Sequence, residues 1–357
     1  MTRVTQRRIR TRRLAAGIVL LASTAAVGAL LASPAAAEAG GRPALTRPVF
    51  MRSEGRVVLP SPSRTVTAVP TGHPALVTGR AMPAQMPSAS TVRSAQLTFR
   101  NVSNPQDPTF TQLLGINNRN MIAGYFGSGA AGHPNQGFTL ALPANFTSEN
   151  VPGAAQTQVI AVNQSGGTGG FFIDSAGTTH GFVKIGGTFT TIDLPGTPFN
   201  QVLGVNDRGQ TAGYFQDASG VNHAWIRDAS GTFTVPPIAN SQATGVNDDG
   251  TVVGFTQASA TESSGFVLAR GHVTLLNVPG STFTQALGEN NIGQIVGFYN
   301  DAAGNSHGFV YQHGAFRTVD VPGAKATTVN GINDHGAMVG FFTDAAGNTV
   351  GFVATPR

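Results

Sequence analysis

The chain has 357 residues, which is enough for two ordinary domains or for one large repetitive domain. Its 46 glycines and its short runs of Val, Ile, Leu and Phe favour many short strands joined by tight turns. The absence of cysteine excludes disulfides, thiolate catalysis and Cys-ligated zinc. Stability must then come from the packing of a sizeable core.

The first 37 residues have the pattern of a secretory signal peptide. Six arginines lie within residues 3–13, an apolar run covers residues 14–32, and small residues lead up to Ala37. We expect cleavage after Ala37 or Ala39 and a secreted, extracellular protein with no stable membrane span. The alternative is an uncleaved membrane anchor, because an apolar run of about 19 residues can just cross a bilayer. The export route stays open.

Charge is distributed unevenly along the chain. The whole sequence has 22 Lys and Arg against 17 Asp and Glu, and its isoelectric point is about 10.2. Residues 38–95 are rich in Pro, Ala, Ser, Thr and Arg, carry a net charge of +5 and are predicted to be a flexible spacer. Residues 96–357 hold nine basic and fifteen acidic residues, a net charge of −6. We therefore expect no nucleic-acid partner.

From residue 96 onward the chain repeats a unit of about 43 residues. Each unit contains an anchor formed by a small residue, a β-branched residue and Asn, followed by a polar turn; Glu289 replaces the β-branched residue of the fifth anchor. Successive anchors lie 46, 43, 41, 43 and 43 residues apart, a spacing typical of β-propellers. The anchor asparagines are Asn117, Asn163, Asn206, Asn247, Asn290 and Asn333.

The third unit shows the expected strands most clearly. Its turns are rich in Asn, Asp and Gly, which tolerate the left-handed region of backbone space. Four strands joined by tight hairpins make one propeller blade, and a Pro-Gly connection such as residues 193–198 leads to the next inner strand. The predicted strands cover residues 201–205, 211–215, 223–226 and 232–235.

The two ends of the repeat array predict closure into a ring. The sixth unit stops after its third strand, residues 351–353, while residues 96–102 match a fourth strand placed before the first anchor. Pairing of these segments completes the last blade and removes an exposed sheet edge. We predict an all-β, six-bladed propeller over residues 96–357, closed by strand 96–102 and monomeric.

Three recurring segments carry a resemblance to a known family. They are residues 189–196 (FTTIDLPG), 331–336 (GINDHG) and 307–310 (HGFV), with residues 223–225 as the closest form of a His-Ala-Phe element. The pattern resembles the bacterial extracellular repeat family named for that element, the HAF repeat, over nearly all of residues 96–357. The resemblance implies an extracellular repeat protein and implies no assigned activity.

Three units also carry the pattern Asp-x-x-Gly-x-x-His. Because adjacent strands run in opposite directions, these turns and the Pro-Gly connections fall on one face. That face is interpreted in one of two ways. It is either an oxygen-rich surface that binds a polyol or calcium as a cofactor, or a set of Asp residues that cap their own turns beside buried His. Its candidate ligand-binding residues are Asp174, His180, Asp193, Asp217, His223, Trp225, Asp301, His307 and Asp320, with Asp217 and Asp301 as metal candidates.

Residues that break the repeat are better candidates for function than residues that follow it. The anchor asparagines either ring a channel or stabilise their turns, and their position before a turn favours the second role. Glu289 is expected to project towards the channel, where a lone carboxylate is a candidate general base. Trp225 is the only tryptophan in the chain.

Three functions fit these patterns. A binding module for an extracellular polymer, a glycan or a protein is favoured by repetition, export and the lack of a nucleophile elbow, a phosphate-binding loop or a His-Glu-x-x-His helix. The second is a propeller lyase or hydrolase with a metal or an acid/base pair at the channel mouth. The third is a structural envelope protein.

Overall fold

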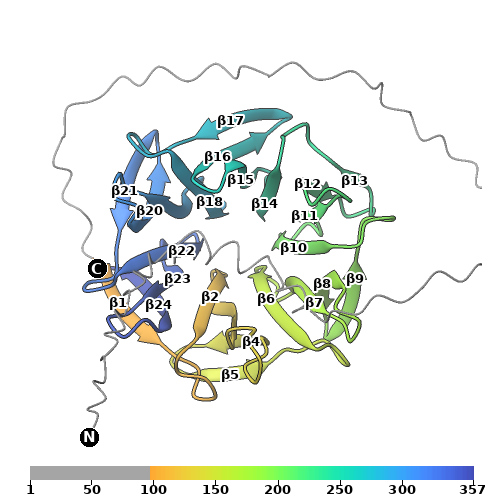
Figure 1. The fold of residues 1–357 in the computed structure, drawn as a ribbon, viewed down its shortest axis with the longest axis horizontal. Coiled ribbons are helices and arrows are strands. Elements are labelled where there is room, and N and C mark those ends of the chain that lie inside the picture. The colour runs from red at the N-terminus through yellow and green to blue at the C-terminus, as the bar shows by residue number, and fades with distance from the viewer. Residues whose placement is uncertain (1–96) are drawn as a thin grey trace, which may run out of the picture.

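The computed structural model describes residues 97–357, which form strands β1 to β24 and contain no helix (Figure 1). The predicted signal peptide and spacer lie outside the described residues. Within residues 97–357 no helix is long and apolar enough to cross a membrane. The sheets stand around a central axis like blades, so the prediction of an all-β propeller is confirmed.

The strands form five sheets, of which four have four strands and one has eight. In the four-stranded sheets the inner strand lies at the channel and the later strands follow outward. The first sheet contains β2 (Thr111–Ile116), β3 (Met121–Phe126), β4 (Gln136–Ala141) and β5 (Asn145–Ser148). The second contains β6 (Gln156–Val162), β7 (Thr168–Ile173), β8 (Thr179–Ile185) and β9 (Thr188–Ile192). The third contains β10 (Asn200–Val205), β11 (Thr211–Gln216), β12 (Asn222–Arg227) and β13 (Phe233–Thr234).

The eight-stranded sheet has two antiparallel halves that are joined only by one parallel bridge, Ser263 to Phe283. One half contains β14 (Ser241–Val246), β15 (Val252–Ser259), β16 (Glu262–Ala269) and β17 (His272–Leu276). The other contains β18 (Phe283–Glu289), β19 (Ile295–Asn300), β20 (Ser306–Gln312) and β21 (Ala315–Val319).

The last sheet joins the two ends of the described chain. It contains β22 (Ala326–Ile332), β23 (Met338–Thr343), β24 (Thr349–Pro356) and, as its outer strand, β1 (Leu97–Val102). β1 pairs antiparallel with β24 from Leu97 opposite Pro356 to Val102 opposite Gly351. The predicted pairing of the N-terminal strand with the last unit is therefore observed. It removes the free edge that β24 would otherwise expose.

At four of the six anchors, Gly115, Gly204, Gly288 and Gly331, the close approach of neighbouring inner strands requires glycine. A Cβ atom on Gly288 would lie 2.3 Å from the backbone oxygen of Asn330, and one on Gly331 would lie 2.7 Å from that of Leu114. Such distances leave no room for a side chain without a shift of the backbone. Only β6 has a larger residue, Ala161, at this position.

A second glycine position explains the aromatic core between the sheets. Gly213 on β11 lies beneath the ring of Trp225 on β12, and a Cβ atom on this glycine would lie 2.7 Å from the ring. Gly297 lies beneath the ring of Phe309 in the same way, and a Cβ atom there would lie 2.9 Å from that ring. The aromatic residue that follows each such glycine is buried in the core. The buried aromatic residues are Tyr125, Phe171, Tyr214, Phe255, Phe298 and Phe341.

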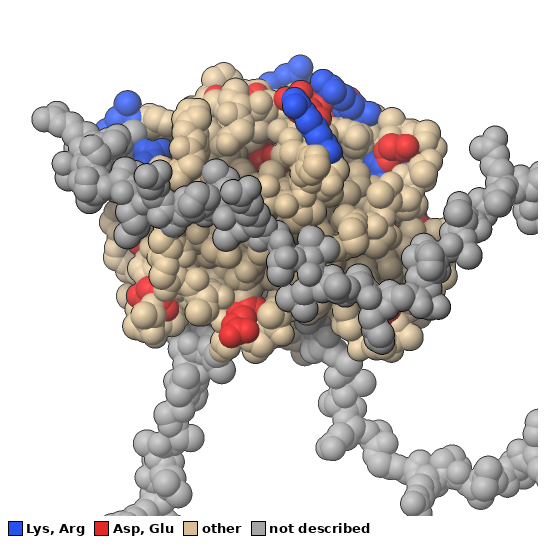
Figure 2. Space-filling view, turned by 90° about the horizontal axis from the view of Figure 1, so that it is seen from above, with Lys and Arg blue, Asp and Glu red and all other residues tan. Residues whose placement is uncertain are grey.

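The hairpin turns place different chemistry at the two ends of the propeller. We call the end that carries the turns 117–120, 163–166, 206–209, 247–250, 290–293 and 333–336 the Asn face. We call the opposite end, where the second hairpin of each unit turns at residues such as 174–177, 217–220 and 301–304, the Asp face. Figure 2 shows Lys and Arg gathered along one rim of the molecule, while Asp and Glu lie on that rim and on the opposite one.

Candidate functional site

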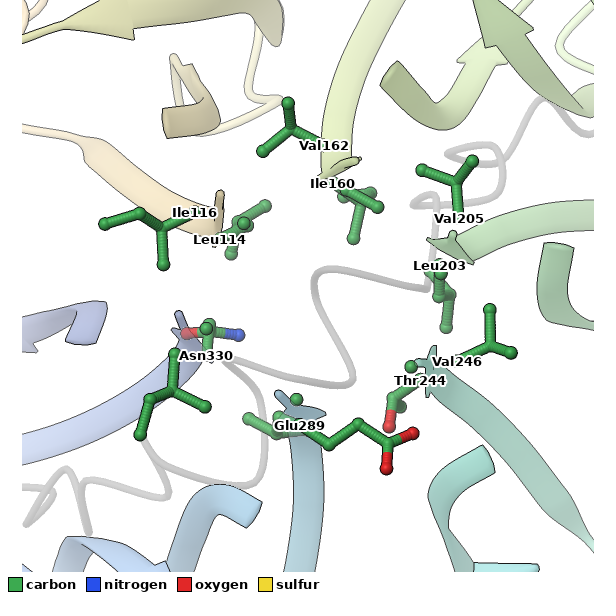
Figure 3. A pocket seen from close by; sticks show the side chains of 18 residues that line it. Leu114, Ile116, Ile160, Val162, Leu203, Val205, Thr244, Val246, Glu289 and Asn330 are labelled. Carbon is green, nitrogen blue, oxygen red and sulfur yellow. The ribbon is translucent and has the colours of Figure 1, made fainter. Parts of the chain in front are cut away.

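The central channel holds a cavity of about 120 Å³ that is lined by all six inner strands (Figure 3). Each inner strand has a register shift, one residue before the small residue of its anchor. A β-bulge of this kind leaves one residue unpaired and re-aims its side chain. The bulged residues line the channel as one ring: Leu114, Ile160, Leu203, Thr244, Leu287 and Asn330.

A second ring lies next to the bulged residues, at the middle position of each anchor. Five of its members are Ile or Val, as expected for buried strands. The sixth is Glu289, which therefore lines the channel as predicted (Figure 3). The members of this ring are Ile116, Val162, Val205, Val246, Glu289 and Ile332.

Three polar side chains interrupt the apolar wall on consecutive inner strands. Thr244 lies on β14, Glu289 on β18 and Asn330 on β22. The strands on the other side, β2, β6 and β10, present only aliphatic side chains to the cavity. The channel therefore has one polar side and one apolar side, a combination typical of small-molecule sites.

Glu289 is the only ionisable residue that lines this cavity. Burial raises its pKa well above the usual range, although the backbone N–H groups of Asn247 and Val253 act to lower it. Its buried Oε1 atom and the Oδ1 atom of Asn330 have no hydrogen-bond partner among the described residues. Thr244 differs, because its hydroxyl lies 2.9 Å from the backbone oxygen of Ala286 and 3.2 Å from that of Val253.

The anchor asparagines combine the two roles that the sequence left open. Each Oδ1 atom accepts backbone N–H groups of its own turn; in Asn247 these come from Asp249 and Thr251, both at 3.0 Å. Each Nδ2 atom donates to the backbone carbonyl of the next anchor asparagine. The donations run from Asn117 to Asn163, Asn206, Asn247, Asn290 and Asn333, and from Asn333 back to Asn117.

A polar mouth of about 70 Å³ lies on the Asn face of the channel. The residue that follows each anchor asparagine binds its neighbour here; for example, the N–H of Asn291 donates to Asp334 at 2.8 Å, and the N–H of Asp334 donates to Asn118 at 2.8 Å. Glu289 lines both this mouth and the apolar cavity, so it lies at their junction. The carboxylates of the mouth belong to Asp207, Asp248 and Asp334.

The predicted Asp and His residues meet on the Asp face. His180 lies between two carboxylates, with Nδ1 2.6 Å from Asp193 and Nε2 3.5 Å from Asp174. Partial burial alone would lower its pKa, but these two carboxylates raise it above the usual value. The predicted proximity of Asp193 to the turn tip is confirmed.

The fifth unit repeats this cluster. His307 contacts Asp320 at 2.8 Å and Asp301 at 3.4 Å, and its pKa is raised for the same reason. Hydrogen bonds from the side chain and backbone of Asn305 are the main cause that lowers the pKa of Asp301 to about 2. In the third unit, His223 pairs with one carboxylate, Asp217, at 2.9 Å.

These carboxylates already bind their own turns and histidines. Asp217, for instance, accepts the backbone N–H groups of Ser219 and Val221. Asp217 and Asp301 lie in different sheets, and residues 97–357 contain no group of three or more His, Asp or Glu side chains suited to a metal ion. The geometry of the Asp face therefore matches the turn-capping interpretation of these residues.

Trp225 does not lie on a surface that a ligand can reach, so its selection as a ligand-binding residue was wrong. Its side chain is fully buried and packs edge-on against Phe233, with ring centroids 5.2 Å apart. It occupies the position that Phe holds on the equivalent strand of every other unit. The signal was available in the sequence, since the residue two positions after each histidine of the His-Ala-Phe element is aromatic.

Sequence reasoning also missed Thr244 and Asn330. Both directly precede the small anchor residue, where the other four units have Leu or Ile. Their departure from the repeat was therefore visible, but the orientation of that position was not. A bulge places it towards the channel.

Glu149 is a third departure that the sequence reasoning did not use. It replaces the aliphatic residue that ends the other outer strands, such as Ile192 and Val319. Its buried carboxylate binds Nζ of Lys184 at 3.1 Å and the hydroxyl of Thr168. Because all three groups are paired between the first and second sheets, Glu149 has a structural role.

No protein-family model matches the chain, and no curated protein matches it. Among solved structures, a streptogramin B lyase is 12% identical and covers 72% of this chain and 97% of its own, with a TM-score of 0.45. TolB from Acinetobacter baumannii is 9% identical and covers 71% of this chain and 66% of its own, with a TM-score of 0.47. A lectin from Aleuria aurantia in complex with alpha-methyl-L-fucoside is 10% identical and covers 69% of this chain and 93% of its own, with a TM-score of 0.43. This likeness carries no conclusion about a ligand or an activity.

Proposed function

We propose that this protein is an exported binding module whose ligand site is the central channel. The observation that carries the proposal is the polar side of an otherwise apolar cavity, formed by Thr244, Glu289 and Asn330. Oε1 of Glu289 and Oδ1 of Asn330 are buried in the channel wall and have no hydrogen-bond partner among the described residues, and buried acceptors without a partner are costly in a folded protein. A ligand with hydrogen-bond donors relieves that cost once these side chains turn towards it.

The size of the cavity limits what enters it. A space of about 120 Å³ takes a small molecule or the end group of a larger one, and it excludes a folded protein. Among the partner classes expected from the sequence, an end group of a glycan or of a cell-wall polymer fits this limit.

We infer that the propeller has six blades. The two halves of the eight-stranded sheet share only one bridge, and six inner strands carry one bulge each, which supports a count of one blade for each unit of about 43 residues. Membership of the HAF repeat family is proposed on the repeated sequence pattern.

Export is proposed from the n-region arginines and the apolar run of residues 14–32. Protein recovered from the culture medium or the cell envelope should begin at Glu38 or Gly40 when its N-terminus is sequenced. A chain that keeps Met1 and stays in the membrane fraction would support the anchor alternative.

A binding role is preferred to an enzymatic one because of the chemistry in the cavity. Acid/base catalysis by a pair of groups needs a second ionisable residue near Glu289. Among the residues that line the same cavity there is none. A lyase or hydrolase remains the second candidate, since a buried carboxyl with a raised pKa has the property of a general acid.

The test is a binding screen on the purified protein with glycans, cell-wall fragments and small metabolites, read by ligand-observed NMR. We expect at least one ligand to bind the natural protein and to lose binding in Ile160→Phe, which fills the channel from its apolar side. The same ligand should bind the double variant His180→Gln/His307→Gln, which alters the Asp face only. Binding that survives in Ile160→Phe and is lost in the histidine variant would move the site to the Asp face.

A further inference from the structure

We propose that the channel ligand is a small organic cation, an ammonium group on a short apolar body, that enters through the mouth on the Asn face and places its charge beside Glu289. The inference rests on the proposed function and names the ligand class of the same site. Four properties of the channel lead to it.

The first property is the sign of the charge along the path. The mouth and the cavity together are lined by four carboxyl groups and by no Lys, Arg or His. Charges that line a narrow space with protein walls act on a ligand more strongly than charges on an open surface. The four groups belong to Asp207, Asp248, Asp334 and Glu289.

The second property is the kind of atom that lacks a partner. Oε1 of Glu289 and Oδ1 of Asn330 are buried in the wall beside the cavity without a partner, and the hydroxyl of Thr244 already donates to backbone oxygens. An ammonium group offers three donors and no acceptor. The ionised form of Glu289 accepts hydrogen bonds from such a group and repels an anionic ligand.

The third property is the arrangement of polar and apolar walls. Leu114, Ile160 and Leu203 line the half of the channel that is formed by β2, β6 and β10 (Figure 3). A ligand whose charged group lies at Glu289 therefore has an aliphatic surface for the rest of its body. Burial of that body adds to the affinity in proportion to its apolar area.

The fourth property is the position of Glu289 at the junction of the mouth and the cavity. A cation that passes Asp248 and Asp334 reaches Glu289 as the next carboxyl group. The two arginines of the Asn turns, Arg119 and Arg208, lie exposed and do not line either space. Arg208 is also paired with Asp249 at 3.7 Å.

Charged groups around Glu289 also set the expected pH dependence. Besides the mouth carboxylates, the turns that define the Asn face carry Arg119, Arg208, Asp249 and His335, and no other ionisable group lines the cavity. A bound cation favours the ionised form of Glu289, so binding should release a proton and the affinity should increase with pH.

The experiment compares butylammonium with 1-butanol, which has the same shape and no charge, by titration calorimetry and ligand-observed NMR. The proteins are the natural chain, Glu289→Gln, Ile160→Phe and the control Glu262→Gln, which changes an exposed carboxyl on β16. Unfolding curves establish that each variant is folded. If Glu289→Gln does not fold, Glu289→Val, which has the residue of other anchors at this position, takes its place.

We expect butylammonium to bind about tenfold or more tightly than 1-butanol, to lose about tenfold or more in Glu289→Gln, and to be unchanged in Glu262→Gln. Equal binding of the two compounds, or binding of butylammonium that Glu289→Gln leaves unchanged, would overturn the cation proposal. If neutral compounds of the wider screen bind and are lost in Ile160→Phe, the channel site stands while the ligand class is wrong. If Ile160→Phe affects no binding at all, the proposed function fails together with this inference.

Discussion

The side-chain amide of Asn333 donates a hydrogen bond to the backbone carbonyl of Asn117, 216 positions earlier in the sequence, at 3.1 Å. This bond closes a ring in which each anchor asparagine holds the next one. The same side chain caps its own turn through Oδ1, which accepts the N–H groups of His335 and Ala337. One residue type therefore shapes the turn and joins neighbouring units.

Replacement of Asn333 by Ala should destabilise the fold at the point where the two ends meet. The variant loses its turn cap and leaves buried backbone groups without partners, for which we expect a loss of about 1–3 kcal/mol in the free energy of unfolding. Urea unfolding measures the effect. Asn145→Ala, on the exposed part of β5, is the control and should change stability by less than about 0.5 kcal/mol. Equal effects at the two positions would contradict a closing role for Asn333.

Gly288→Ala should also be destabilising, because the added Cβ would lie 2.3 Å from the backbone oxygen of Asn330. Overpacking against backbone atoms costs about 1–3 kcal/mol. The matched control is Ala161→Gly, which brings the equivalent position of β6 to the residue found elsewhere and should cost about 1 kcal/mol or less. Thermal unfolding of both variants tests the comparison. If Gly288→Ala is as stable as the natural chain, the inner strands are less closely packed than described.

Trp225→Phe restores the residue that the other units have at this position, and it should lower stability without any effect on ligand binding. The smaller ring leaves space above Gly213, and the expected cost is about 1–3 kcal/mol, against about 3–5 kcal/mol for Trp225→Ala. Chemical denaturation followed by circular dichroism gives both values. A change in ligand affinity with unchanged stability would return Trp225 to the list of candidate ligand residues.

The clusters around His180 and His307 should make stability depend on pH. Since the pKa of each histidine is higher in the folded protein than its ordinary value of 6.5, the stabilising effect is complete below that value and is lost as pH rises through the folded-state pKa. The double variant His180→Gln/His307→Gln should flatten the decrease in unfolding free energy above about pH 6.5. His272→Gln, on an exposed residue of β17, is the control and should keep the natural slope.

Glu289→Val should stabilise the ligand-free protein. Because burial raises the pKa of Glu289 in the folded state, the natural chain loses stability as pH rises above the ordinary value of 4.5. Valine restores the apolar ring, and we expect a gain of about 1–3 kcal/mol at neutral pH together with a weaker pH dependence. Urea unfolding at pH 4.5 and pH 8 measures both. A destabilised variant would mean that the backbone N–H groups of Asn247 and Val253 stabilise Glu289 by more than its burial costs.

Much of the fold was predictable because a repeat makes local and neighbouring interactions recur at one spacing. The Asn turns, the four-strand order, the pairing of β1 with β24 and the proximity of His180 to Asp193 all follow from strand alternation within and between adjacent units. These features depend on turn chemistry and on the direction of successive strands, both of which can be read from residue type and spacing.

The channel site depended on tertiary structure. A period of two assigns alternate residues to opposite faces, but the bulge in each inner strand shifts that alternation by one residue and turns Thr244 and Asn330 towards the channel. Trp225 shows the opposite case. Its residue type is unique in the chain and was interpreted as a departure from the repeat, but its buried ring occupies the position that Phe has in the other units. Position in the ring, rather than residue type, decides which departures from the repeat reach a ligand.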